Sequence, residues 1–367
     1  MNKIKNIILV SLTALLILTG SVLCIFGKSD GYSDSERRDL AKFPPLSLST
    51  IKDGSFMRDF ESYATDNFPA RDAFRTIKAF SELKVFNKSD NNGLYVKDGY
   101  IAKIDYPLNE DMVTGACDKF EFIYNSFIKD NNCNVFLSVI PDKNFFLANE
   151  NGYLSADFDS AVDIMKENMS YAQYIDILPM LSLEDYYFTD THWKQENITD
   201  IASALCEKMG ATLSDEYTEI QLDNPFYGVY YGQLALPVNP DKLSYLTNDT
   251  IENCTVTSYA TGMAKPSVMY NLEKADGKDP YELFLSGSEP LLVIENPDAH
   301  TDKHLILFRD SFGSSIAPLF AEAYSKITVV DIRYVQSAVL GSFIDFSDSD
   351  VLFLYSTLLL NNSSALR

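Results

Sequence analysis

Two segments far apart along the chain contain side chains that together can activate a hydroxyl group. Residues 186–193 read Tyr-Tyr-Phe-Thr-Asp-Thr-His-Trp and include Asp190 and His192, one of only three histidines in the sequence. Residues 307–313 read Leu-Phe-Arg-Asp-Ser-Phe-Gly and place Ser311 just after an apolar run. A serine, a histidine base and an aspartate are the minimum set for an acyl-accepting nucleophile. Ser311, His192 and Asp190 are therefore candidate catalytic residues.

The sequence around Ser311 predicts a turn from a strand into a helix. Residues 305–308 are apolar, and the small residues 313–315 let a helix begin close to a sheet. In an open parallel sheet, ligands bind beyond the carboxyl ends of the strands, where free backbone N–H groups of a helix start can stabilise an oxyanion. The alternative is that Asp310 or Ser311 only caps the helix.

The Asp-Thr-His segment is expected to be a loop before a helix. Residues two apart on extended backbone point the same way, so Asp190 and His192 can approach one site together. Asp190 would orient the imidazole, and His192 would take the proton of Ser311. In the alternative reading His192 is exposed, Trp193 is in the core and Asp190 caps the helix. No metal site is expected, because no further ligand cluster accompanies this pair.

Short apolar runs alternate with helical patterns along most of the chain. Strands are predicted at 134–140, 174–178, 304–309, 327–332 and 351–355, and helices at 111–130, 161–171, 198–209 and 315–324. Fully apolar strands between helices indicate an α/β protein with a mostly parallel, doubly covered sheet. Residues 212–300 are rich in Tyr, Thr, Asn, Gly and Pro and break this rhythm. They are expected to form an inserted, mainly β segment.

The N-terminal residues have the composition of a membrane-targeting segment. Lys3 and Lys5 precede an uncharged apolar run from residue 7 to 26, which Lys28 and Asp30 close. A run of about 20 apolar residues is long enough to span a bilayer, and its positive flank should stay in the cytoplasm. An uncleaved anchor is favoured over a cleaved signal peptide, because no small-x-small site follows the run. We expect a stub and anchor at 1–30, a stalk and helical segment at 31–92, and the main domain at 93–367.

Charge and cysteine content narrow the possible partners. The chain has 52 acidic and 30 basic residues, a net charge of -22, so nucleic acid and anionic lipid head groups are poor partners. Neutral or cationic substrates are compatible with this charge. The five cysteines lack metal-ligand spacing, and Cys117 and Cys133 are equally compatible with a disulfide or with free thiols.

Taken together, these segments resemble the DHHW family of exported bacterial proteins and, more distantly, the alginate O-acetyltransferases, both SGNH-hydrolase-like. The resemblance covers most of residues 55–360. The matching pieces lie, in order, at 66–72, 141–143, 187–193, 284–290, 308–313 and 331–334. This sequence departs from the pattern at Thr191, where the family name has its first histidine, at Ser288 instead of asparagine, and at Arg309 instead of glycine.

The resemblance implies a flavodoxin-like SGNH fold and a Ser311–His192–Asp190 triad that transfers an acyl group, without a cofactor, to hydroxyls of a cell-wall polysaccharide or exopolysaccharide. It implies that a multispanning membrane acyltransferase supplies the acyl group outside the cell, close to an enzyme anchored through residues 7–26. Substrate or oxyanion contacts are expected from Gly287, Arg309, Lys143, Tyr187 and Trp193. Two alternatives stay open: an esterase that removes acyl groups from such glycans, and a non-catalytic glycan-binding protein.

Overall fold

The structure is a computed structural model that describes residues 2–26, 31–33, 35–213 and 216–367. The charges Lys28 and Asp30, expected to close the apolar run, lie outside these residues. The chain divides into two compact units. We call residues up to 92 together with 231–237 the N-terminal unit, and residues 93–230 and 238–367 the sheet unit.

The N-terminal unit is mostly helical. Its elements are α1 (Asn2–Phe26), β1 (Tyr32–Ser33), β2 (Arg38–Asp39), α2 (Leu48–Lys52), α3 (Ser55–Asp66), α4 (Arg71–Phe80) and a π-helical turn, η1 (Ser81–Val85). Within α1, the stretch Lys3–Ile25 contains an 18-residue window with a mean hydropathy of 2.5, and the helix is long and apolar enough to cross a membrane. This agrees with the predicted anchor helix.

The sheet unit is built on an eight-stranded sheet of order β10-β9-β11-β13-β12-β14-β5-β6. The strands are β5 (Asn134–Ile140), β6 (Gln173–Tyr174), β9 (Thr255–Ser258), β10 (Lys265–Ser267), β11 (Leu291–Glu295), β12 (His304–Arg309), β13 (Lys326–Val330) and β14 (Ser349–Ser356). Strands β13, β12, β14, β5 and β6 are parallel, while β11, β9 and β10 join antiparallel at one edge. The predicted mixed α/β fold with a mostly parallel sheet is therefore confirmed.

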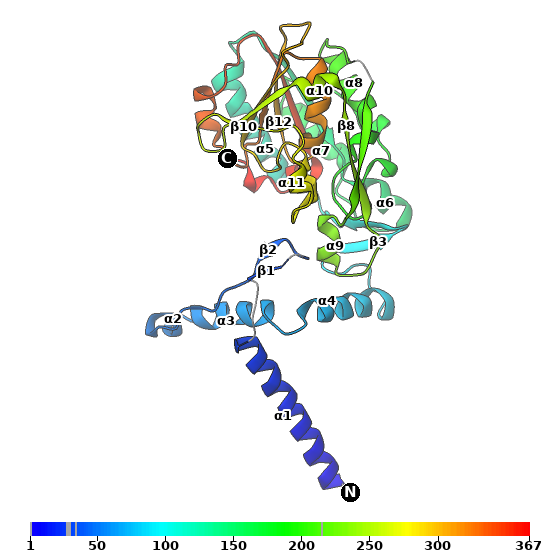
Figure 1. The fold of residues 1–367 in the computed structure, drawn as a ribbon, viewed down its shortest axis with the longest axis vertical. Helices are drawn as coiled ribbons and strands as arrows, with labels where there is room; N and C mark the ends of the chain where they lie inside the picture. The colour runs from blue at the N-terminus through cyan, green and yellow to red at the C-terminus, as the bar shows by residue number, and fades with distance from the viewer. Residues whose placement is uncertain (1, 27–30, 34, 214–215) are drawn as a thin grey trace. The chain divides into compact units, whose positions relative to one another are not determined.

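Helices cover both faces of this sheet (Figure 1). The remaining elements, in chain order, are β3 (Leu94–Lys97), β4 (Tyr100–Lys103), α5 (Glu110–Ile123), η2 (Tyr124–Ile128), α6 (Lys143–Asn151), α7 (Phe158–Asn168), η3 (Leu178–Met180), η4 (Leu183–Asp185), η5 (Gln195–Asn197), α8 (Thr199–Lys208), β7 (Thr218–Phe226), α9 (Val229–Leu234), β8 (Asp241–Thr247), α10 (Asp249–Asn253), α11 (Leu272–Ala275), η6 (Pro280–Leu283), α12 (Gly313–Ile316), η7 (Ala317–Glu322), η8 (Ser337–Ser342), α13 (Thr357–Leu360) and η9 (Ser363–Ala365).

Alternate residues of each central strand point into two separate cores. On β12, Leu305 and Leu307 pack with α8 and η7, whereas Ile306 and Phe308 pack with α5 and α7. This two-sided burial explains why the central strands are apolar runs without alternation. Within 212–300, β9, β10 and β11 extend the central sheet, while β7 and β8 form a separate antiparallel pair.

The carboxyl ends of the parallel strands meet at one edge of the sheet. In the strand register Phe308 lies beside Val330, Arg309 beside Leu354, and Ser356 beside Ile140. The segments that follow these strands, at 141–143, 310–313 and 331–333, therefore start side by side. Three of the segments singled out in the sequence thus lie at the same edge.

Candidate active site

Ser311 lies in the turn between β12 and α12, where its Oγ atom is 2.7 Å from Nε2 of His192. Asp310 holds this turn in place. Its Oδ1 accepts the Phe312 backbone N–H at 3.0 Å, and its Oδ2 accepts the Ser356 backbone N–H at 2.8 Å and hydroxyl at 2.6 Å. Asp310 is thus an anchor between β12 and the end of β14. Its capping contact with Phe312, one of the alternatives raised by the sequence, coexists with an accessible hydroxyl on Ser311.

The turn requires a glycine at position 313. A Cβ atom there would lie 2.4 Å from Cβ of Arg309, closer than real carbon contacts allow. Without that side chain, α12 begins directly against the end of β12, and Ser311 stays partly exposed. Among the described residues, no acceptor is found for the Ser311 backbone N–H. This N–H is therefore a candidate donor for an oxyanion.

His192 is held between Ser311 and Asp190. Its Nδ1 is 2.5 Å from Oδ1 of Asp190, and the same carboxylate oxygen accepts the His192 backbone N–H at 3.1 Å. A carboxylate can only accept, so Nδ1 carries the proton in the neutral imidazole and Nε2 is the base that faces Ser311. His192 is 9% exposed and Asp190 1% exposed, so the pair is largely shielded from water.

The second oxygen of Asp190 is bound by the first residue of α9. Oδ2 accepts the Val229 backbone N–H at 2.8 Å. Gly228 passes so close that a Cβ there would lie 2.4 Å from Asp190 atoms. The Gly228 N–H also donates to the Thr189 hydroxyl at 2.8 Å. Both carboxylate oxygens are thus occupied, which fixes the plane of Asp190.

The loop that presents Asp190 and His192 is supported by two buried charges. The Lys143 ammonium donates to the backbone carbonyls of Tyr187 at 2.9 Å, Phe188 at 3.2 Å and Asp190 at 2.5 Å. Asp241 accepts the backbone N–H groups of Phe188 and Thr189, each at 2.7 Å. Burial lowers the pKa of Lys143 to about 8 and raises the pKa of Asp241. The loop backbone therefore lies between an ammonium and a carboxylate.

Aromatic packing fixes the imidazole ring. The rings of His192 and Tyr281 stack with centroids 3.8 Å apart, and Phe312 lies 4.9 Å from the imidazole on a tilted plane. Trp193 is fully buried, and its Nε1 donates to the Phe312 carbonyl at 3.1 Å and to Ser315 Oγ at 2.9 Å. Trp193 therefore ties the histidine loop to the serine turn.

Of the five residues expected to contact substrate or oxyanion, four are buried and Gly287 is half-buried. Lys143, Tyr187 and Trp193 are 0% exposed, and Arg309 is 1% exposed. The Gly287 N–H already donates to the Phe284 carbonyl at 3.1 Å, and its own carbonyl accepts from Arg309 at 3.3 Å. Arg309 also pairs with Asp331 at 3.2 Å. These contacts favour a supporting role for the five residues.

Sequence reasoning missed several supports of the site, namely Asp241, Tyr281, Gly228 and Ser356. No short motif marks any of them, because each reaches the site only through long-range folding. The five cysteines are free, with Cys117 buried against Met165 at 3.4 Å between the sulfur atoms. Within the described part of the chain, no group of three or more His, Cys, Asp and Glu residues has the arrangement of a metal site.

Comparison with solved structures supports the fold. A DHHW family protein from Eubacterium siraeum DSM 15702 matches with a TM-score of 0.59 at 20% identity, over 75% of this chain and 94% of that one. Bacillus cereus PatB1 matches with a TM-score of 0.59 at 18% identity, over 74% and 97% of the two chains. PatB1 with a sulfonyl adduct gives 0.57 at 18% identity, over 73% and 95%.

A weaker likeness involves the O-acetyltransferase domain of Pseudomonas putida AlgJ, with a TM-score of 0.42 at 12% identity over 73% of this chain and 92% of that one. That score is too low to carry an argument. No family model and no curated protein matches the sequence. At these identities the likeness establishes the shared fold, and the activity has to be argued from the site itself.

Proposed function

We propose that this protein is an extracytoplasmic O-acyltransferase that uses Ser311, His192 and Asp190 as a catalytic triad. The observation that carries the proposal is the continuous chain of contacts from Ser311 Oγ to His192 Nε2 at 2.7 Å and from His192 Nδ1 to Asp190 at 2.5 Å. Both distances are within hydrogen-bonding range, and the nucleophile, base and orienting group stand in the order that the chemistry requires.

The reaction proceeds in two steps. Ser311 Oγ attacks the carbonyl carbon of the acyl donor while its proton passes to His192 Nε2, and Asp190 stabilises the imidazolium. The donor's leaving group departs with that proton, leaving an acyl ester on Ser311. A sugar hydroxyl then attacks the ester as His192 takes its proton. The acyl group is transferred, and Ser311 recovers its proton.

The oxyanion formed in both steps needs donors that are not already engaged. The Ser311 N–H meets this condition, because the described residues offer it no acceptor. Gly287 does not donate to the oxyanion, since its N–H already donates to the Phe284 carbonyl. Its own carbonyl accepts a hydrogen bond from Arg309 and so helps to position that side chain. The guanidinium of Arg309 is likewise a positioning group, held by Asp331.

The acceptor class follows from charge and location. Residues 93–367 hold 41 acidic and 17 basic residues, which disfavours a polyanionic acceptor. A neutral or cationic cell-wall or extracellular polysaccharide fits better. The apolar helix α1 supports an extracytoplasmic site, since a positive flank that stays inside would leave the rest of the chain outside. A multispanning membrane acyltransferase would then supply the acyl group, as the resemblance to the alginate O-acetyltransferases implies.

A labelling experiment tests the nucleophile. The full-length protein is treated with a fluorophosphonate probe, alongside Ser311→Ala and the control Ser89→Ala, which alters an exposed serine outside the sheet unit. We expect labelling of wild type and of Ser89→Ala and none of Ser311→Ala. Equal labelling of Ser311→Ala would remove Ser311 as the nucleophile.

A product analysis separates transfer from hydrolysis. The protein is mixed with 4-nitrophenyl acetate with and without a neutral oligosaccharide, and the acetylated sugar is measured by mass spectrometry. Acetylated oligosaccharide that depends on Ser311 supports the transferase. Free acetate alone, with every acceptor offered, would favour an esterase. A protein that binds the glycan but releases neither product would be a binding protein.

A further inference from the structure

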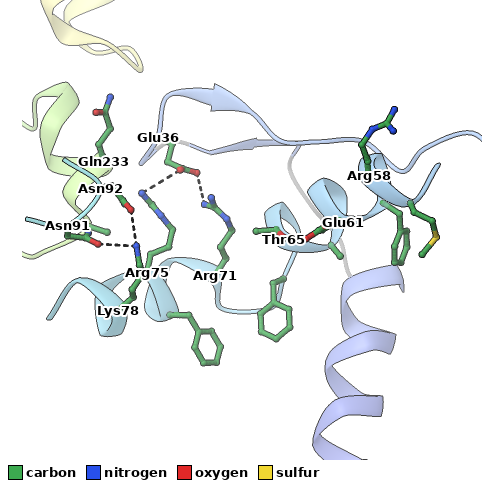
Figure 2. A pocket seen from close by; sticks show the side chains of 16 residues that line it. Glu36, Arg58, Glu61, Thr65, Arg71, Arg75, Lys78, Asn91, Asn92 and Gln233 are labelled. Carbon is green, nitrogen blue, oxygen red and sulfur yellow. Dashed lines mark hydrogen bonds and ion pairs between the residues drawn. The ribbon is translucent and has the colours of Figure 1, made fainter. Parts of the chain in front are cut away.

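Helix α4 in the N-terminal unit is amphipathic in an inverted sense: its charged side faces protein and its apolar side faces outward. Arg71 contacts Glu36 at 2.6 Å, and Arg75 lies 3.5 Å from Glu36 and donates to the Gly232 carbonyl at 2.7 Å. Figure 2 shows both arginines extending toward Glu36 and Lys78 extending toward Asn91 and Asn92. The side of a surface helix that normally meets water is thus taken up by protein contacts.

The apolar side of the same segment is largely uncovered by the described residues, apart from an edge contact between the rings of Phe74 and Phe68 at 5.6 Å. Phe74 is 56% exposed, Ile77 60% and Phe80 54%. Met57 and Phe68, which line one groove with Phe74, are also exposed, as are Val85 and Phe86. Soluble proteins rarely expose a contiguous patch of this kind, so the surface needs an occupant.

Contacts of α1 with Tyr63 of α3 and with Phe68, which follows α3, point to a lipid occupant. The Tyr63 hydroxyl donates to the Cys24 carbonyl at 3.0 Å, and the Phe68 ring approaches Gly20 so that a Cβ there would lie 3.8 Å away. Gly20 is six residues before the end of α1, or about 9 Å along the helix axis. It also lies inside the apolar stretch Lys3–Ile25. When α1 spans a bilayer, Phe68 is therefore level with the acyl chains.

Charge and shape agree with a lipid surface. Residues 31–92 contain ten basic and ten acidic residues, so this segment lacks the strong negative charge of residues 93–367. An open groove of about 1200 Å³ beside α3 and α4 brings Phe60, Phe68 and Phe74 together with the exposed Arg58. Apolar rings beside long cationic side chains suit the boundary between acyl chains and phosphate head groups.

We propose that α3 and α4 lie in the interface of the membrane that α1 crosses, with Phe68, Phe74, Ile77 and Phe80 inserted among the lipid chains. The N-terminal unit is then a lipid-bound platform in place of a stalk exposed to water. This proposal does not depend on the chemistry at Ser311, since none of its residues belongs to the sheet unit.

Tryptophan substitution in the full-length protein tests this placement. Phe74→Trp and Ile77→Trp are reconstituted into nanodiscs of phosphatidylcholine and of the same lipid brominated on its acyl chains, which quenches nearby indoles. Thr76→Trp is the matched control, because it lies on the same helix about 160° from Phe74. The wild type, whose one tryptophan is buried in the sheet unit, sets the background.

We expect the emission added by Phe74→Trp and Ile77→Trp to be mostly lost in brominated lipid, while that of Thr76→Trp is retained. Equal emission of Phe74→Trp and Ile77→Trp in the two lipids would overturn the proposal, because protein or water would then cover this side of α4. Equal quenching of all three variants would also overturn it, since the helix would have no preferred side toward the lipid.

Discussion

The ring of His192 stacks on the ring of Tyr281 with an interplanar angle of 4° and a centroid distance of 3.8 Å. The Tyr281 hydroxyl donates to Ser315 Oγ at 2.9 Å, which also accepts from Trp193. Burial raises the pKa of Tyr281 well above its ordinary value, so the phenol stays protonated. The neutral Tyr281 ring thus packs flat against the imidazole and stops it from turning away from Ser311.

Removing the stacked ring of Tyr281 should slow turnover more than it weakens substrate binding. Tyr281→Leu frees the imidazole to rotate, and we expect kcat to fall by roughly 10- to 100-fold with KM little changed, because a small misplacement of a catalytic group is costly. Tyr281→Phe keeps the stacked ring and should retain most of the activity. Wild-type kcat in Tyr281→Leu would contradict the positioning role.

Lys143 should matter for the order of the catalytic loop. Lys143→Met removes the donor for three backbone carbonyls and leaves them buried, so we expect a loss of about 1–3 kcal/mol in the free energy of unfolding and lower activity. The matched control is Lys194→Met, in the same region, where a less buried lysine donates to the Glu184 carbonyl. Chemical denaturation of both variants measures the difference, and equal losses would argue against a special role for Lys143.

The close passage of residue 228 beside Asp190 gives a steric test. Gly228→Ala places a methyl group within 2.4 Å of Asp190 atoms, so the loop has to shift and the Val229 N–H moves away from the carboxylate. We expect activity to fall at least about tenfold, as for other displaced catalytic groups. Gly115→Ala, whose new methyl would meet only an ordinary 3.9 Å contact, should keep wild-type activity. Similar activities in the two variants would refute this account.

Glu196 predicts a pH dependence of stability. Burial, with Glu219 and Asp241 nearby, raises the pKa of Glu196 to about 7, and its Oε2 finds no hydrogen-bond partner among the described residues. The folded protein then holds a proton that the unfolded chain releases near pH 4.5, so this residue lowers stability as pH rises from about 4.5 to 7. The Tm of Glu196→Gln minus the Tm of wild type should therefore increase as the pH is raised from 5 to 8. A constant Tm difference across this range would exclude the effect.

Much of the fold could be predicted because its main signals are local. The apolar runs at 134–140, 304–309 and 351–355 became β5, β12 and β14 within a residue or two of the expected ends. Other elements differ more. The helix expected at 161–171 lies three residues earlier, at Phe158–Asn168. The strand expected at 174–178 is reduced to Gln173–Tyr174, and the helix expected at 315–324 is the short α12 followed by the 3-10 segment η7, where Pro318 cannot donate a helical hydrogen bond.

The site was predictable only in part. Asp190, His192 and Ser311 stand in recognisable local patterns, and the structure brings their side chains into contact. Their supports do not stand in such patterns, since Tyr281 and Asp241 reach the site through long-range folding. The exposure of the apolar side of α4 could not be predicted either, because periodicity identifies an amphipathic helix but does not tell which side contacts protein.

The acyl-enzyme tests the central claim most directly. The protein is incubated briefly with 4-nitrophenyl acetate, quenched in acid, digested and mapped by mass spectrometry. We expect an acetyl group on Ser311 in the wild type and on no residue in Ser311→Ala, with far less in His192→Ala. Acetylation of another residue at the wild-type rate in Ser311→Ala, or an unmodified Ser311 during turnover, would contradict the account.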